Sequence, residues 1–186
     1  VRVMHFNILQ ATSETAGHEW ASVRKEPCIT MFNSIKPDIV CIQEARKSQC
    51  SDLETALPGY LQSKHPKDDT PTNGGQRNLI LYKAGDWVCL GWDKLWFSTD
   101  RTASGDRFGD SKTTQKMLMY AQLKHIKSQK KVWVFDAHFF ADCEYSKSRD
   151  SCVAVTIQTI RKICPGDTHC FFCGDLNINY NDDSMR

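Results

Sequence analysis

The stretch from Cys170 to Asn177 constrains the fold of this chain more than any other. It reads Cys-Phe-Phe-Cys-Gly-Asp-Leu-Asn, an apolar run that ends in Gly174 and continues into Asp175 and Asn177. Residues two apart on a strand face the same way, so we expect a carboxylate and an amide together at the end of a buried strand. Gly174 leaves room for something to approach the backbone. A turn closed by Asx hydrogen bonds is the other interpretation of Asp-x-Asn.

Three other apolar segments also become polar at their ends, and these ends offer acid–base and metal-ligand side chains. One polar residue at a strand end is commonly a cap or a surface charge. Four strands with the same pattern indicate a shared site, because sites in layered α/β folds gather outside the strand ends. The segments are 1–9, 37–44 and 131–139, with Asn7, Glu44, and Asp136 and His138 near their respective ends.

In this order, the motifs resemble the endonuclease/exonuclease/phosphatase superfamily, whose members cut phosphodiesters or phosphomonoesters with a divalent metal. Each motif alone is weak, but the ordered set is specific and extends over nearly the whole chain. The matching residues are Phe6-Asn7, Pro37-Asp38-Ile39 through Gln43-Glu44, Ala137-His138 and Gly174-Asp175-Leu176-Asn177.

Two positions depart from the family pattern. Ala137 stands where the family has Thr or Ser before the His, and the sequence reaches Arg186 without the late Asp-His motif. We therefore expect a single domain over residues 1–186 whose C-terminal part is missing. The protein is then either an enzyme that needs further residues or a non-catalytic binding protein on the same fold.

The resemblance implies an α/β fold with two mixed β-sheets packed as a sandwich and helices on the outer faces, which makes four layers. The alternation of strand and helix patterns along the chain agrees with such a mixed arrangement. Helices are predicted over 24–35, from a capping box at Ser51 to Pro58, and over 149–164. Further strands are predicted over 78–82, 87–90 and 117–125, and polar loops over 10–20, 65–76 and 100–116.

The chemistry of the residue types, supported by the resemblance, assigns the roles. Glu44 is the expected principal ligand of Mg²⁺, or of Mn²⁺, and Asn7 beside it is expected to be a neutral metal ligand or a support for the phosphate. Asp175 orients or deprotonates the attacking water, and Asn177 holds the phosphate. His138 donates to a phosphate oxygen or protonates the leaving group; a buried structural His is the alternative.

Two further residues are expected to bind substrate. Arg149 matches an Arg that often follows the His motif, although a surface Arg at a helix start is as plausible. Asn78 lies in a weaker match that runs to Tyr82. Asp136 faces the same way as His138 and is either a support for the site or a plain surface charge.

The overall prediction is hydrolysis of a phosphodiester, most simply by a nuclease, with nucleic acid or another phosphodiester as the partner. A phosphatase or a sphingomyelinase-type enzyme is the alternative within the family. A net charge of +2 does not by itself imply binding of a polyanion. No run of residues is long and apolar enough for a membrane span. Candidate contacts to nucleic acid are Trp92, Trp96, Arg101 and Arg107, and both tryptophans could equally belong to the core.

The nine cysteines leave at least one unpaired within the chain. Cys41 and Cys173 fall inside predicted core strands, where a free thiol behaves as a small apolar group. We therefore expect both to be free. Cys143, Cys152 and Cys164 could form bridges, and the sequence does not decide this.

Overall fold

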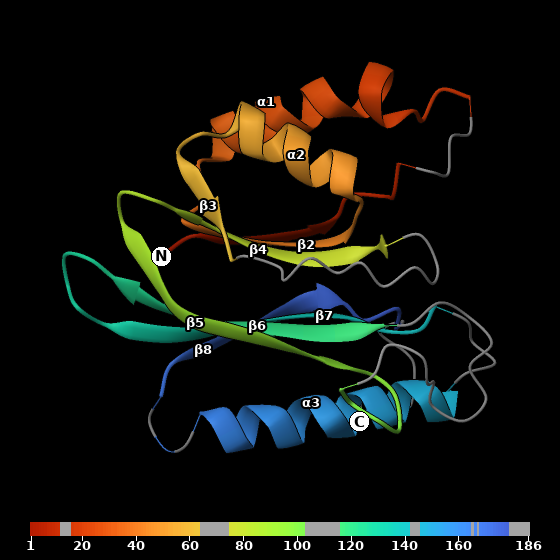
Figure 1. Ribbon diagram of the computed structural model, residues 1–186, viewed down its shortest axis with the longest axis vertical. Coiled ribbons are helices and arrows are strands. Elements are labelled where there is room, and N and C mark those ends of the chain that lie inside the picture. Colours follow the sequence, from red (N-terminus) through yellow and green to blue (C-terminus); the bar gives the residue numbers. More distant parts are fainter. Residues whose placement is uncertain are drawn as a thin grey trace.

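The computed structural model describes residues 1–11, 16–63, 75–102, 116–141, 146–164, 166 and 168–178. Two four-stranded sheets pack face to face, with helices on both outer sides (Figure 1). This is the predicted sandwich of two mixed sheets, and the fold class is confirmed. The described strands are β1 Val3–Asn7, β2 Ile39–Ala45, β3 Tyr60–Gln62, β4 Arg77–Lys83, β5 Trp87–Trp96, β6 Met117–His125, β7 Lys131–His138 and β8 Cys170–Asp175. The helices are a π-helical turn at Trp20–Arg24, α1 Lys25–Ile35, α2 Lys47–Ala56 and α3 Ser146–Ile163.

Each sheet contains one parallel and two antiparallel pairings. The first sheet has the order β1-β2-β4-β3, with β1 parallel to β2. The second has the order β5-β6-β7-β8, with β7 parallel to β8. The parallel pairs matter for function because they bring the carboxyl ends of β1 and β2, and of β7 and β8, to one end of the sandwich.

Strand β2 shows how the sequence divides the interior into layers. Its side chains alternate, so Val40 and Ile42 pack with the helix-covered core while Ile39 and Cys41 pack between the two sheets. Because both faces are covered, the strand is apolar from Ile39 to Ile42 rather than alternating, and it becomes polar only at Gln43 and Glu44 near its end. A third core lies between the second sheet and α3 and includes Phe135 of β7.

Several element boundaries differ from the sequence prediction. Helix α2 begins at Lys47, four residues before the predicted capping box, because the Gln49 side chain accepts a hydrogen bond from the Arg46 N–H at 3.0 Å and closes the first turn. Strand β5 continues past Leu90 to Trp96 through an irregularity in register between Cys89 and Gly91. Most of the loops predicted over 65–76 and 100–116 lie outside the described residues.

Candidate active site

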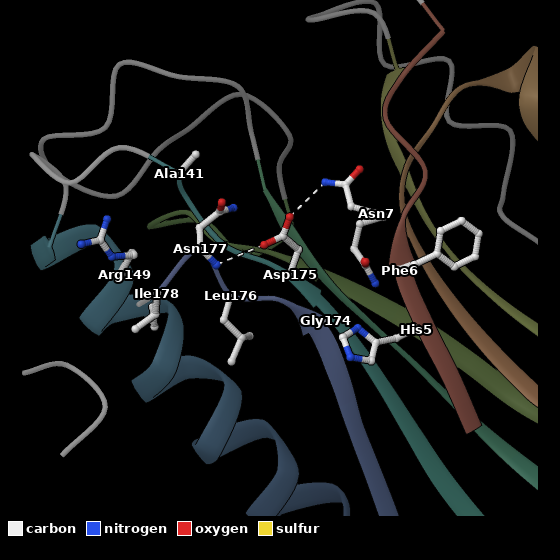
Figure 2. A pocket seen from close by; sticks show the side chains of 11 residues that line it. His5, Phe6, Asn7, Ala141, Arg149, Gly174, Asp175, Leu176, Asn177 and Ile178 are labelled. Atoms are coloured by element: carbon white, nitrogen blue, oxygen red, sulfur yellow. Dashed lines mark hydrogen bonds between the residues drawn. The ribbon is translucent and has the colours of Figure 1, made fainter. Parts of the chain in front are cut away.

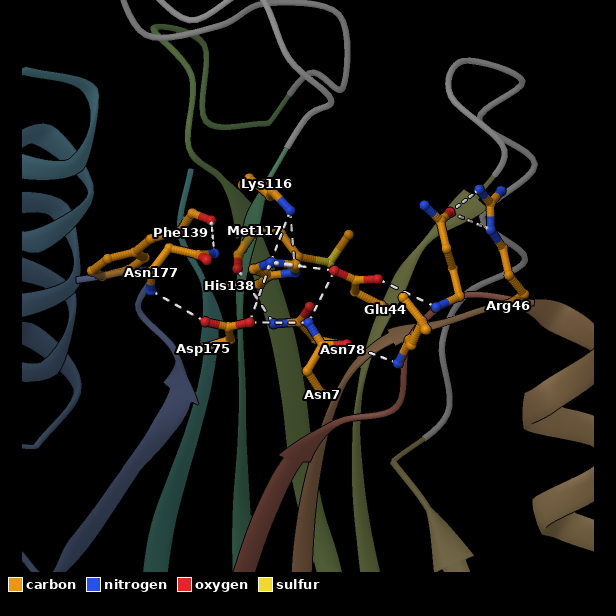
Figure 3. A network of polar contacts seen from close by, with 12 residues as sticks. Asn7, Glu44, Arg46, Asn78, Lys116, Met117, His138, Phe139, Asp175 and Asn177 are labelled. Carbon is orange, nitrogen blue, oxygen red and sulfur yellow. Dashed lines mark hydrogen bonds and ion pairs between the residues drawn. The ribbon is translucent and has the colours of Figure 1, made fainter. Parts of the chain in front are cut away.

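Four strands of the two sheets end at one place. Asn7 is the last residue of β1, Glu44 lies near the end of β2, and His138 and Asp175 are the last residues of β7 and β8. One atom, the Asn7 amide nitrogen, donates to Glu44 Oε1 at 2.9 Å and to Asp175 Oδ2 at 3.0 Å (Figure 3). The strand-end residues of the predicted site are therefore brought together.

The backbone at Glu44 is strained. Its φ is +66°, a left-handed conformation that is uncommon for a residue with a side chain. The pairing of β2 with β4 shifts register between Ile42 and Ala45, so Glu44 lies in a bulge. The bulge aims the carboxylate at the site while Gln43 stays wholly buried. Strain of this kind persists only where the surrounding structure enforces it.

The Asp175–Asn177 segment corrects one step of the sequence argument. Strand β8 ends at Asp175, and Asn177 has a φ of +50°, so the two residues do not share a strand face. Instead Asp175 Oδ1 accepts a hydrogen bond from the Asn177 backbone N–H at 3.2 Å, which makes the turn that was the alternative interpretation. Asn177 Nδ2 donates to the Phe139 carbonyl at 3.0 Å. Both side chains still line one pocket (Figure 2).

Gly174 is required for steric reasons. Its backbone lies against β7, where a Cβ atom would come within 2.3 Å of the Ala137 carbonyl oxygen. The expected close approach to this glycine is therefore made by the neighbouring strand, and it fixes Asp175 opposite His138 in the register of the pair.

His138 is buried beside Lys116, a residue that the sequence analysis did not select. The Lys116 Nζ lies 2.9 Å from Nε2 and 3.3 Å from Nδ1 of the imidazole. Burial and then the Lys116 charge lower the pKa of His138 to about 4, and burial lowers the pKa of Lys116 to about 8. The imidazole is consequently neutral near pH 7. Its approaches to Glu44 at 3.8 Å and Asp175 at 3.9 Å are then not ion pairs.

The pocket beside Asp175 has a volume of about 630 Å³. Arg149 of α3 lines it, as do Asn7, Asp175 and Asn177, so the predicted Arg is near the site and largely buried rather than on the surface (Figure 2). Asn78 does not line this pocket. It is buried, and its side-chain amide donates to the Asp136 carbonyl at 3.0 Å, which joins β4 to β7. Substrate binding by Asn78 stays a prediction.

Comparison with known proteins relates this geometry to other chains. No protein-family model matches the sequence. A curated relative, the uncharacterized protein L388 of Acanthamoeba polyphaga mimivirus, is 24% identical over 96% of this chain and 68% of its own. The crystal structure of an endonuclease/exonuclease/phosphatase from Bacteroides vulgatus superposes with a TM-score of 0.87 at 22% identity, covering 100% of this chain and 69% of that one. The chain has the endonuclease/exonuclease/phosphatase fold.

Two other solved structures share this fold. The Bacteroides thetaiotaomicron mannosyl-6-phosphatase Bt3783 has a TM-score of 0.85 at 20% identity. The superposition covers 100% of this chain and 68% of that one. D. rerio TDP2 complexed with single-strand DNA product has a TM-score of 0.73 at 18% identity, with 100% and 63% of the two chains covered. The resemblance inferred from the motifs is thus confirmed for the fold.

The donor set at this end of the endonuclease/exonuclease/phosphatase fold suits a hard divalent cation. Two carboxylates, Glu44 and Asp175, share the Asn7 amide, and Mg²⁺ is usually bound by one or two carboxylates with several waters. Among the described residues no group of three His, Cys, Asp or Glu side chains could hold a metal ion. Asn7 presents its nitrogen to the carboxylates, while its Oδ1 accepts from the Leu9 N–H at 2.9 Å. The Asn7 side chain therefore links the two carboxylates, and its role as a metal ligand or phosphate support stays a prediction.

Lys116 is the site residue that sequence reasoning missed. It directly precedes β6 and is the last residue of the polar loop predicted over 100–116, so a lone Lys there carries no motif signal. The structure buries it because β6 and β7 are neighbours and β7 ends in His138.

Proposed function

We propose that this protein is a divalent-metal-dependent phosphoester hydrolase in which an activated water attacks the phosphorus directly. The observation that carries the proposal is the pair of carboxylates, Glu44 and Asp175, held by one Asn7 amide beside a neutral His138 and a buried Lys116. Negative side chains so close together are costly without a cation, and a phosphate brought to such a site needs positive charge and hydrogen-bond donors. Lys116 and His138 would supply the charge and a donor, and Glu44 would supply a ligand for the cation.

When bound, Mg²⁺ or Mn²⁺ would act as a Lewis acid on a phosphoryl oxygen. Glu44 would be its principal ligand. Asp175 would take the proton of the attacking water, since Asn177 N–H and Asn7 Nδ2 fix the orientation of its two oxygens. The Asp175 carboxylate stays accessible to water despite these two hydrogen bonds, since 30% of its side chain is exposed.

Three side chains would stabilise the phosphate. The neutral His138 imidazole has one ring N–H and donates it to a phosphate oxygen. Its low pKa makes this contact more favourable than proton transfer to the leaving group at pH 7. The Asn177 amide has a second hydrogen besides the one given to the Phe139 carbonyl. Arg149, which also lines the pocket, would add a charged donor.

A phosphodiester, as in nucleic acid, is the proposed substrate. The DNA product bound by D. rerio TDP2 supports this choice, and the Bacteroides mannosyl-6-phosphatase supports a phosphomonoester as the second candidate. The predicted stacking residues favour neither, because Trp96 is buried and Trp92 packs against the core between the sheets. Arg101 is exposed, and Arg107 lies outside the described residues.

The two candidates separate in one assay. The protein is incubated with Mg²⁺ and either a single-stranded oligodeoxynucleotide or a sugar phosphate, and products are followed by chromatography. Cleavage of the oligonucleotide that stops on chelation supports the phosphodiester proposal, while release of inorganic phosphate from the sugar alone would assign a phosphatase. Binding of phosphate esters without any turnover would point to a non-catalytic protein.

A further inference from the structure

A buried carboxyl group connects the two sheets directly below the candidate site. Asp136 of β7 and Gln43 of β2 are both 0% exposed, and Gln43 Nε2 donates to Asp136 Oδ1 at 2.6 Å. This contact joins the strand that ends in His138 to the strand that carries Glu44. Gln43 directly precedes Glu44, so a contact that holds the Gln43 side chain also restrains the backbone at Glu44.

The other two atoms of this contact are left without a partner. Among the described residues, neither Asp136 Oδ2 nor Gln43 Oε1 has a hydrogen bond, and both are buried. Two unpaired buried acceptors are costly, and an ionised carboxylate without a cation is more so. A carboxylic acid removes the difficulty, because it has one O–H donor beside its acceptor and matches the donor and acceptor of a primary amide.

Among the described residues, no side chain supplies a compensating positive charge to Asp136. It is faced by Gln43 and Cys41 from β2 and by Cys173 from its neighbour β8, while Asn78 of β4 binds its backbone carbonyl. His138 lies two residues along the same strand and is itself neutral near pH 7. Within the described part of the chain, no Lys or Arg makes an ion pair or hydrogen bond with Asp136. Burial accordingly raises the pKa of Asp136 well above its usual range.

We propose that Asp136 is a neutral carboxylic acid that clamps Gln43 across the two sheets and so holds Glu44 in its left-handed bulge. The Asp136 O–H donates to Gln43 Oε1, and the Gln43 amide donates to Asp136 Oδ1. Asp136 is thus a positioning residue that does not touch substrate. The neutral state of Asp136 and its contact with Gln43 do not depend on the proposed function, whereas a contribution of this contact to metal or phosphate binding rests on it.

Hydrogen exchange can follow the clamp without any assay of activity. The Gln43 carbonyl accepts a hydrogen bond from the Ile8 N–H at 3.1 Å, so exchange of the Ile8 amide reports whether this part of β2 keeps its place. The Cys164 amide, bonded to the Ile160 carbonyl at the end of α3, serves as a distant reference.

The decisive comparison is Asp136→Asn against Asp136→Ala. Asparagine has the shape of the protonated acid and can make both contacts, so Ile8 exchange should stay within about threefold of wild type. Alanine leaves the Gln43 amide buried and unsatisfied, so Ile8 exchange should rise about tenfold or more while Cys164 is unaffected. Equal exchange in wild type and Asp136→Ala would overturn the positioning role, even if catalysis fails for other reasons.

A second measurement tests the neutral state. The unfolded Asp ionises near pH 4 while the folded one does not, so the unfolded state loses a proton that the folded state keeps. As pH rises above about 4, the folding equilibrium of wild type should therefore weaken relative to Asp136→Asn, by up to about tenfold per pH unit. Asp150→Asn, an exposed change on α3, should run parallel to wild type. Parallel curves for wild type and Asp136→Asn would show an ionised Asp136 and overturn the proposal.

Discussion

The ammonium group of Lys116 lies 2.9 Å from Nε2 of His138, and both side chains are buried at the end of the second sheet. Burial first, and then the Lys116 charge, lower the pKa of His138. This relationship makes His138 a neutral hydrogen-bond donor at physiological pH, which is how the proposed site uses it. It also leads to the first prediction.

Replacing Lys116 with Met should raise the pKa of His138. Burial is the larger cause of its depression to about 4, so the new pKa should lie above 4 and below the usual value of about 6.5. Titration of the imidazole C–H signals by NMR measures it. Lys131→Met, an exposed change at the start of β7, the strand that ends in His138, is the matched control and should leave the titration of His138 unchanged.

The same depression has a consequence for acid stability. Between pH 6.5 and about 4 the unfolded His binds a proton that the folded His138 does not, so stability falls as pH falls through this window. Lys116→Met should bring the pKa of folded His138 closer to that of the unfolded chain, and so should reduce the loss of stability between pH 6.5 and about pH 4. Urea unfolding at pH 7 and pH 4.5 gives the comparison, and an equal loss of stability in both proteins would contradict the effect of Lys116 on the pKa of His138.

Glu44→Gln should weaken binding of Mg²⁺ or Mn²⁺. The amide keeps the size of the side chain but removes the charge that a hard cation requires. Calorimetric titration of each ion into the variant and into wild type measures the change. Glu54→Gln, an exposed change on α2, should bind as wild type does. If Glu44→Gln also binds like wild type, Glu44 is not the principal ligand.

Gly174→Ala should destabilise the protein by about 2 kcal/mol or more, because a methyl group at this position meets a backbone oxygen rather than a movable side chain. Thermal or urea unfolding measures the loss. Gly91→Ala on β5 meets nothing within 4 Å and is the control. Comparable stability of the two variants would show that β7 and β8 are not as close as the structure places them.

Cys41 and Cys173 were predicted to be free thiols, and the structure has both free. The sulfhydryl group of Cys41 donates to Cys173, an interaction that lowers the pKa of Cys173. Alkylation under denaturing conditions without reduction, followed by mass spectrometry, should label both. Cys152 and Cys164 are also free in the structure, and Cys143 lies outside the described residues.

The sequence was most informative where the chain is buried and repetitive in pattern. The apolar runs of β2, β7 and β8 can be recognised because covered strands must be apolar, and their polar ends mark the site. The fold can then be identified from the motifs, because those that contain Asn7, Glu44, His138 and Asp175 follow one another in the same order as in the family. No single one of these residues would have sufficed.

What the sequence could not supply depends on contacts between distant segments. Lys116 enters the site only through the pairing of β6 with β7, and a lone Lys before an apolar strand carries no signal of its own. The start of α2 depends on the Gln49 amide rather than on a typical capping residue. Asp136 could have been a surface charge until its partner Gln43 was located in the other sheet.

Hydrolysis of a model phosphodiester tests the central claim most directly. With Mg²⁺ present and at saturating substrate, Asp175→Asn should lower turnover by about 10²–10⁴-fold, because it removes the proposed general base. Asn7→Ala should lower it less, and chelation should abolish it. Substrate affinity of Asp175→Asn should change little, since the lost interaction belongs to the transition state. Turnover by Asp175→Asn at the wild-type rate would contradict the account.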